Sequence, residues 1–261
     1  MMVIAWRVGI HSRPAPNASR WKAKAMSQVY DVILADPPWS FKVWNKDTGN
    51  GRSAEAHYPT MTLDDICALP IKELASQNCA LFIWSVWPSI FDAEKVINAW
   101  GFKYKTLGFE WWKLNKYWER AWVPMLDVFS GYKWLERMFF FGMGYYTRTN
   151  SEPCLLATRG SMPVAVHDER NFIIAPVREH SRKPDEQYEK IERLYPNARK
   201  LELFARRRRP GWDVFGNQVE GSIRLPTLRE PDLWESVPLS ALSHLRVDPH
   251  LEANPIPPTR G

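Results

Sequence analysis

The amino-acid sequence predicts an α/β protein built on an open, mostly parallel sheet with helices on both faces. Short apolar runs alternate along the chain with segments whose apolar residues recur at helical spacing. The runs are apolar at nearly every position, which is typical of parallel strands covered on both faces. With 261 residues, the chain is long enough to bury a core without disulfides or metal ions.

The first predicted elements are a strand and a short helix. Residues 29–35 (VYDVILA) form the kind of short apolar run that a central parallel strand needs. Thr62 and Asp65 have the spacing of a capping box, which predicts a helix that starts there and ends near Pro70. The chain therefore opens in the order strand, then helix.

A second strand and helix repeat this order. Residues 79–86 (CALFIWSV) form another buried-strand pattern, and Ser89 and Asp92 have the capping-box spacing again. The helix that follows has its apolar residues on one face, and Gly101 supplies its C-terminal stop. This alternation is what a parallel sheet with crossover helices requires.

The second half of the chain continues the pattern. Three further strands are predicted, at residues 103–112, 153–159 and 171–175. An irregular aromatic stretch, at about residues 113–150, separates the first two of these. Pro184 suits the first residue of a helix whose apolar residues lie along one side. The last predicted strand, residues 200–205 (KLELFA), runs directly into four arginines.

Charge and proline content divide the chain into three predicted parts. Residues 1–25 hold five basic residues and no acidic one, so most of the net charge of +6 lies there. We therefore expect residues 1–27 to be a flexible basic arm and residues 28–225 to be the folded domain. Residues 226–261 are rich in proline, which predicts an extended tail.

Cysteine usage and hydropathy exclude several classes of protein. Cys67, Cys79 and Cys154 are odd in number and sit in apolar surroundings, which is typical of reduced cysteines in the cytoplasm. Their spacing matches no zinc site, and no metal is expected. No apolar run approaches the roughly 20 residues of a membrane span, and the N-terminus lacks the apolar core of a secretion signal.

The motif Asp36-Pro37-Pro38-Trp39 directly follows the first predicted strand. Ligands of open α/β sheets bind beyond the carboxyl ends of the strands, so this motif is placed to face a ligand. Asp36 and the carbonyl of Pro37 offer two acceptors for one amino group, and Trp39 offers a flat face for a base. Two acceptors favour a pyramidal amine, which is a better nucleophile. The alternative is structural: a helix cap, a strand end and a lid over the core.

Further motifs follow this one in a specific order: "YPTM" (58–61), "LFIW" (81–84), "WGF" (100–102), "SRKPDEQYEKIERLYPNARKLELFAR" (181–206) and "GWDVFGNQVEG" (211–221). Together with "ADPPW", they resemble the mRNA-adenosine methyltransferase-like family of DPPW-type adenine amino-methyltransferases. The resemblance runs from about Tyr30 to Gly221 and is strongest to the compact phage and bacterial branch that acts on DNA adenine.

The resemblance implies a Rossmann-like, S-adenosylmethionine-dependent methyltransferase fold over residues 28–225, with the catalytic motif before the cofactor-binding strand. It implies transfer of a methyl group to the 6-amino group of adenine, with no metal. The implied catalytic residues are Asp36, Pro37, Pro38 and Trp39. The implied cofactor-binding residues are Asp36, Lys183, Phe204, Arg206, Asn217 and Gln218. Among substrate-binding residues, Trp39 and Tyr58 match the family.

The arginines after Arg206 depart from the pattern of that family. Their charge predicts that Arg207 and Arg208 contact substrate phosphates, and a solvated turn is the alternative. We expect nucleic acid as the partner and favour DNA over RNA, because no separate RNA-binding module is evident. A protein partner is possible but not required. The alternatives are an RNA adenosine methyltransferase with the same chemistry and a non-catalytic nucleic-acid-binding subunit.

Overall fold

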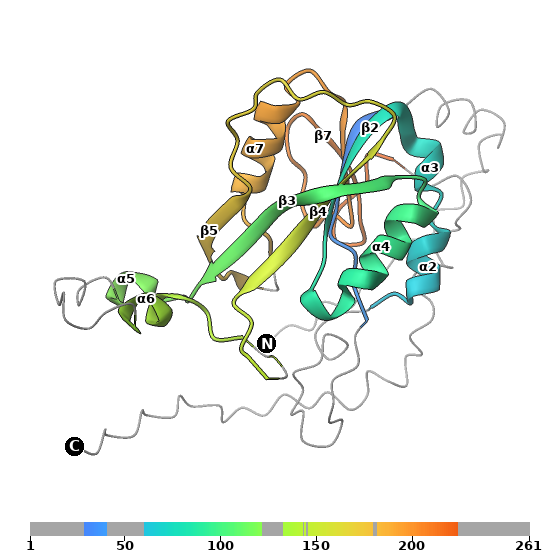
Figure 1. Cartoon of the computed structure of the whole chain (residues 1–261). Coiled ribbons are helices and arrows are strands. Elements are labelled where there is room, and N and C mark those ends of the chain that lie inside the picture. The colour runs from blue at the N-terminus through green and yellow to red at the C-terminus, as the bar shows by residue number, and fades with distance from the viewer. Residues whose placement is uncertain are drawn as a thin grey trace, which may run out of the picture. The chain divides into compact units, whose positions relative to one another are not determined.

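A computed structural model describes residues 29–40, 60–121, 133–142, 144, 146–179 and 182–223 of the chain. Its strands form one seven-stranded sheet in the order β5-β3-β4-β2-β1-β6-β7 (Figure 1). The strands are β1 (Tyr30–Ala35), β2 (Ala75–Trp84), β3 (Lys103–Leu114), β4 (Ser151–Arg159), β5 (Phe172–Pro176), β6 (Lys200–Leu203) and β7 (Trp212–Phe215). The helices are α2 (Leu63–Ala68), α3 (Ile71–Leu74), η2 (Trp87–Ser89), α4 (Ile90–Ala99), α5 (Trp118–Ala121), α6 (Lys133–Met138) and α7 (Glu186–Leu194).

The sheet is mostly parallel, as the sequence predicts. β1 lies between β2 and β6 and is parallel to both, β6 is parallel to β7, and β3 is parallel to β5. Among the strands of the described residues, only β4 runs antiparallel to its neighbours, β2 and β3. The central position of β1 places its carboxyl end beside those of β2 and β6, since Ala35 pairs with both Ile83 and Leu203.

Both faces of the sheet are covered by helices, which α4 and α7 illustrate in Figure 1. On one face, Leu34 and Phe82 belong to a core cluster with Tyr188 and Ile191 of α7. Because successive strand residues point to opposite faces, Ile33, between Val32 and Leu34 of that cluster, points toward the other layer. That layer contains α2 and α4, which contact each other, and α4 also contacts β3. Burying each large apolar side chain contributes about 1.5–3 kcal/mol.

The ends of the helices differ in part from the prediction. Thr62 caps α2 as expected, because its Oγ1 accepts a hydrogen bond from the N–H of Asp65 at 3.1 Å. Ser89 is the N-cap residue of α4 as expected, but its side chain makes no capping bond, and the chain enters α4 through the 3-10 turn η2. Pro184 precedes α7 by two residues instead of opening it, and Asp185 is the N-cap.

The strands also differ in length from the prediction. β6 ends at Leu203, and Phe204 adopts a positive φ of 62° instead of continuing the strand. The sequence reasoning missed β7 and α3, each only four residues long. It also missed the short helices α5 and α6 in the stretch interpreted as irregular. Cys79 and Cys154 are buried as expected, whereas Cys67 is half-buried, and all three are free thiols.

The predicted N-terminal arm (residues 1–27) and C-terminal tail (residues 226–261) lie outside the described residues, so the predicted domain boundaries stay predictions. Within the part of the chain that the structure describes, no helix combines the length and the apolar character needed to cross a bilayer.

Candidate active site

Three parallel strands end at one edge of the sheet and bring the predicted site residues together. Asp36 follows β1, Trp84 is the last residue of β2, and Phe204 follows β6. Because these strands are neighbours and parallel, their carboxyl ends open the same crevice. The DPPW motif therefore lies where the sequence reasoning placed it.

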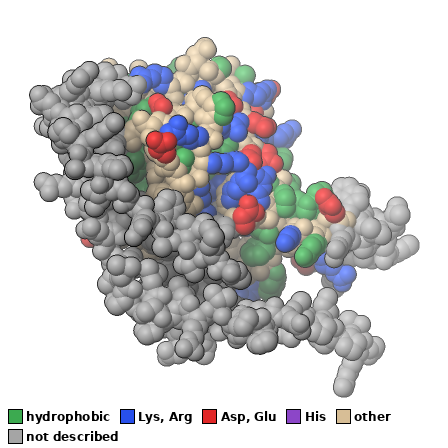
Figure 2. Space-filling model, turned by 180° about the vertical axis from the view of Figure 1, so that it is seen from behind, with side chains coloured by type: hydrophobic (Ala, Val, Ile, Leu, Met, Phe, Trp, Pro, Cys, Tyr) green, Lys and Arg blue, Asp and Glu red, His purple; other side chains and the backbone are tan. Residues whose placement is uncertain are grey.

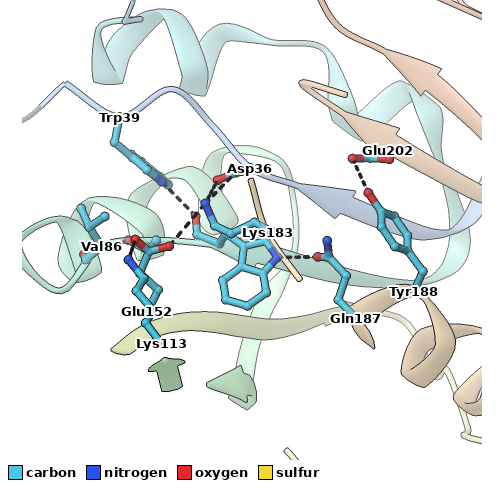
Figure 3. Close-up of polar contacts among 11 residues, drawn as sticks. Asp36, Trp39, Val86, Lys113, Glu152, Lys183, Gln187, Tyr188 and Glu202 are labelled. Carbon is cyan, nitrogen blue, oxygen red and sulfur yellow. Dashed lines mark hydrogen bonds and ion pairs between the residues drawn. The ribbon is translucent and has the colours of Figure 1, made fainter. Parts of the chain in front are cut away.

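Asp36 forms an ion pair with Lys183, the first of two contacts that this lysine makes with carboxylates (Figure 3). The Nζ of Lys183 donates to Oδ1 of Asp36 at 2.8 Å and to Oδ2 at 2.9 Å. It also lies 3.4 Å from Oε2 of Glu152 and 5.7 Å from the ring centroid of Trp84. The structure thus brings into contact two residues that the resemblance had each assigned to cofactor binding.

Glu152, on β4, is a buried acid that the sequence reasoning missed. Its carboxylate lies between Lys183 and Lys113, and Lys113 of β3 donates a hydrogen bond to Oε1 (Figure 3). Burial alone would raise the pKa of the Glu152 carboxyl, but the charges of the two lysines outweigh burial and hold this pKa below its ordinary value. Glu152 is therefore ionised at neutral pH.

Trp39 is fixed by a hydrogen bond to the end of β2. Its Nε1 donates to the carbonyl of Trp84 at 2.9 Å, and only 6% of Trp39 is exposed. The Nε1 of Trp84 donates in turn to Oε1 of Gln187 on α7 at 2.7 Å (Figure 3). A tryptophan held in this way is rigid, but its burial leaves little of its surface open, so stacking on a base stays a prediction.

The carbonyl groups of the two prolines in the motif both accept backbone hydrogen bonds. The carbonyl of Pro37 accepts a hydrogen bond from the N–H of Trp39 at 2.8 Å, and that of Pro38 accepts one from the N–H of Met61 at 3.0 Å. A carbonyl oxygen has two lone pairs, so Pro37 retains capacity for a second donor. The prolines also fix φ, and the loop after β1 is therefore stiff.

A cavity of about 230 Å³ adjoins the Asp36–Lys183 pair. Its lining contains six of the predicted residues: Asp36, Lys183, Phe204, Arg206, Arg207 and Gln218. Among the described residues, five predicted site residues do not line it: Pro37, Pro38, Trp39, Asn217 and Arg208. Gly216, directly before Asn217, lies against the backbone that follows β6, because a Cβ there would lie 2.0 Å from the carbonyl oxygen of Ala205.

Glu202, on β6, is a second acid that the sequence reasoning missed. It lines the cavity, and its Oε1 accepts a hydrogen bond from the hydroxyl of Tyr188 at 2.9 Å (Figure 3). Within the described part of the chain, its buried Oε2 has no hydrogen-bond partner. Burial raises the pKa of the Glu202 carboxyl to about 7, and the charge of Asp36 adds to the effect. An acid in the middle of an apolar strand was the signal that could have found it.

The arginines after Arg206 are paired with carboxylates. Arg207 contacts Asp185, and Arg208 lies 3.4 Å from Glu220. Burial and the neighbouring arginines lower the pKa of the Arg207 guanidinium. On the face opposite to that in Figure 1, Lys and Arg side chains gather with acidic side chains beside them (Figure 2). Phosphate contact by Arg207 and Arg208 stays a prediction.

Two further expectations concern the substrate loop and metals. Tyr58, predicted to lie on the loop that closes over the base, is outside the described residues. In the described segments, no group of three or more His, Cys, Asp or Glu side chains is arranged to hold a metal ion.

Comparisons with known proteins agree on one family. The MT-A70 family matches residues 30–128 and 135–218. The Type II methyltransferase M.MunI from Mycoplasma sp is 27% identical over 220 residues, which cover 78% of this chain and 84% of that protein. The N(6)-adenosine-methyltransferase MT-A70-like protein of Arabidopsis thaliana is 31% identical over 196 residues, covering 74% of this chain and 24% of the relative. The human N(6)-adenosine-methyltransferase catalytic subunit METTL3 is 30% identical over 197 residues, which cover 74% of this chain and 28% of the relative.

Proposed function

The chain belongs to the MT-A70 family, and from this membership we propose that it transfers a methyl group from S-adenosylmethionine to the exocyclic 6-amino group of adenine in DNA. The family consists of S-adenosylmethionine-dependent methyltransferases with a Rossmann-like fold. The observation that carries the proposal is the Asp36–Lys183 pair at the carboxyl end of β1, beside the cavity.

The residues around the cavity fit S-adenosylmethionine chemically. The cofactor has an ammonium group, a carboxylate, two ribose hydroxyls and an adenine ring. Asp36 can accept from the ammonium group, and the unpartnered Oε2 of Glu202 can accept from a hydroxyl. Lys183 and Arg206 supply positive charge for the carboxylate and donors for the ribose, and Phe204 supplies an aromatic face.

The chain's own residues prepare the amino group for reaction. When bound, S-adenosylmethionine supplies an electrophilic methyl group. Asp36 and the carbonyl of Pro37 can each accept a hydrogen bond from the 6-amino group, which orients its lone pair. Lys183 holds the Asp36 carboxylate in place through two hydrogen bonds. Holding both reactants in a fixed geometry supplies much of the rate acceleration.

The extent of the similarity favours DNA as the substrate. The match to the Type II methyltransferase covers 84% of that protein, whereas the chain spans only 24% and 28% of the length of the Arabidopsis and human N(6)-adenosine-methyltransferases. A reaction on duplex DNA would require the adenine to flip out of the helix, at a cost of a few kcal/mol. Single-stranded DNA avoids this cost.

RNA adenosine is the second candidate substrate, because the N(6)-adenosine-methyltransferases are 30–31% identical to this chain. A non-catalytic subunit is less well supported, since the chain has both Asp36 and Trp39. Equal concentrations of DNA and RNA oligonucleotides of the same sequence should be offered with labelled S-adenosylmethionine. We expect kcat/KM to be higher for DNA. A higher kcat/KM for RNA would mean that the substrate is RNA adenosine and would overturn the proposal of DNA.

A further inference from the structure

Four charged side chains form a line that starts inside the protein and ends at the DPPW motif. Their order is Lys113, Glu152, Lys183 and Asp36, so the charges alternate in sign (Figure 3). The side chains of Lys113, Glu152 and Lys183 are only 15%, 9% and 10% exposed, whereas that of Asp36 is 29% exposed. The first three are therefore shielded from water and act strongly on one another.

Lys113 is the member of this line that lies farthest from the cavity. Its Nζ donates to Glu152 and lies 5.0 Å from the ring centroid of Trp111 and 6.0 Å from that of Phe140. Its backbone is fixed as well, because its carbonyl accepts a hydrogen bond from the N–H of Phe140 at 2.7 Å. Lys113 does not line the cavity, and its ion pair with Glu152 is the contact that leads from it toward Lys183.

Asp36 and Glu152 compete for the ammonium group of Lys183, and the charge of Lys113 affects how strongly Glu152 attracts it. The Nζ of Lys183 lies 2.8 Å from Asp36 and 3.4 Å from Glu152. While Lys113 neutralises Glu152, the shorter contact to Asp36 is favoured. Without Lys113, Glu152 would be a buried carboxylate with one cation, and it would draw Lys183 toward itself. Asp36 would then lose part of its support.

We propose that Lys113 is a positioning residue of the methyl-transfer site, which acts through Glu152 to hold Lys183 against Asp36. The inference rests on the proposed function and adds to it a residue outside the cavity. It makes a specific claim about coupling: the effect of Lys113 on the reaction must pass through Lys183.

A double-mutant cycle tests this claim. Lys113→Met should lower kcat/KM for methyl transfer by about tenfold or more in the wild-type background. In a Lys183→Met background the same substitution should change kcat/KM by less than about twofold, because the group through which it acts is gone. An equal loss in both backgrounds would overturn the proposal and leave Lys113 with a purely structural role.

Matched variants separate charge from stability. Lys113→Arg keeps the positive charge beside Glu152 and should recover most of the activity that Lys113→Met loses. Lys105→Met removes an exposed lysine from the same strand and should leave kcat/KM unchanged. If Lys113→Met does not fold, Glu152→Gln replaces it in the cycle, since it removes the buried charge at nearly constant size and should show the same coupling to Lys183.

A second readout does not require activity. The side-chain ammonium signal of Lys183 in a ¹⁵N-labelled protein, identified by its loss in Lys183→Met, should shift in Lys113→Met and stay in place in Lys105→Met. An unshifted signal would overturn the proposal even if the enzyme has no measurable turnover. If the wild-type protein transfers no methyl group but the signal shifts as expected, the proposed function fails while the positioning contact stands.

Discussion

The Nζ of Lys183 donates hydrogen bonds to both carboxylate oxygens of Asp36, at 2.8 Å and 2.9 Å, although the two residues are 147 positions apart in the chain. β1 delivers Asp36, and the segment before α7 delivers Lys183 to the same edge of the sheet. The fold therefore holds the acid of the DPPW motif by a long-range contact, and the acid does not depend on its own loop alone for orientation.

Asp36→Asn should abolish methyl transfer while the protein stays folded. The substitution keeps the size of the side chain but removes the charge that pairs with Lys183 and one acceptor for an amino group. We expect kcat to fall by about 100-fold or more, with little change in the unfolding midpoint, because Lys183 keeps its contact with Glu152. Kinetics and thermal unfolding measure the two effects. Wild-type turnover in this variant would remove Asp36 from the mechanism.

Trp39→Phe should weaken use of the nucleic-acid substrate more than binding of S-adenosylmethionine. Phenylalanine keeps an aromatic ring but loses the hydrogen bond to the carbonyl of Trp84, so the ring is less firmly held. Trp39→Ala would also remove buried surface, at a cost of about 3–5 kcal/mol in stability. We expect a raised KM for the oligonucleotide and an unchanged cofactor Kd by calorimetry. A larger loss in cofactor affinity would mean that Trp39 supports binding of the cofactor and not of the nucleic-acid substrate.

Affinity for S-adenosylmethionine should rise between pH 6 and pH 8 because of Glu202. Its pKa of about 7 means that the acid ionises within this range. Hydroxyl donors of the cofactor favour the ionised form, so binding and ionisation support each other. We expect the affinity of the wild-type protein to rise by about threefold to tenfold over this range.

Glu202→Gln should flatten this pH profile, and the exposed Glu189→Gln, on α7, should leave it intact.

The contribution of Glu202 to the stability of the fold has the opposite pH dependence from its contribution to cofactor affinity. The pKa of Glu202 in the folded protein, about 7, lies above its ordinary value of 4.5, so its contribution to stability is full below pH 4.5 and is lost as pH rises through 7. Glu202→Gln should therefore gain stability relative to the wild type at pH 8. A pH-independent difference would contradict this account.

Replacing Arg207 and Arg208 with alanine should weaken nucleic-acid binding and reduce its dependence on salt. Each lost phosphate contact lowers the slope of log K against log salt by about 0.9 on duplex DNA, so the slope should fall by about one to two. Arg193→Ala is the control, because this arginine is also paired with carboxylates but lies in the last turn of α7. An unchanged slope would mean that Arg207 and Arg208 only serve their pairs with Asp185 and Glu220.

Local patterns carried most of the fold prediction. Buried parallel strands such as β1 are apolar at nearly every position, and the spacing of Thr62 and Asp65 marks the N-terminus of α2. Elements of four residues, such as β7 and α3, are too short to show a periodicity and were missed. Ser89 is the N-cap of α4 as predicted, but it also ends η2 and its side chain makes no capping bond, which the spacing of Ser89 and Asp92 did not reveal.

The candidate site could be predicted only where a motif or a resemblance pointed to it. The position of Asp36 follows from the strand before it, but no periodicity pairs it with Lys183. Glu152 and Glu202 were missed because each lies within an apolar strand, where sequence alone does not reveal which cation or hydroxyl faces it. Lys113 was missed for the same reason, since its partner comes from the neighbouring antiparallel strand.

The position of the transferred methyl group is the most direct test of the proposed function. The purified protein would be incubated with isotopically labelled S-adenosylmethionine and, separately, duplex DNA, single-stranded DNA and RNA, with Asp36→Asn in parallel. The products would then be digested to nucleosides and identified by mass spectrometry. We predict label on the 6-amino group of deoxyadenosine with the wild-type protein and none with Asp36→Asn. Label on another atom or base, or equal labelling by Asp36→Asn, would contradict the central claim.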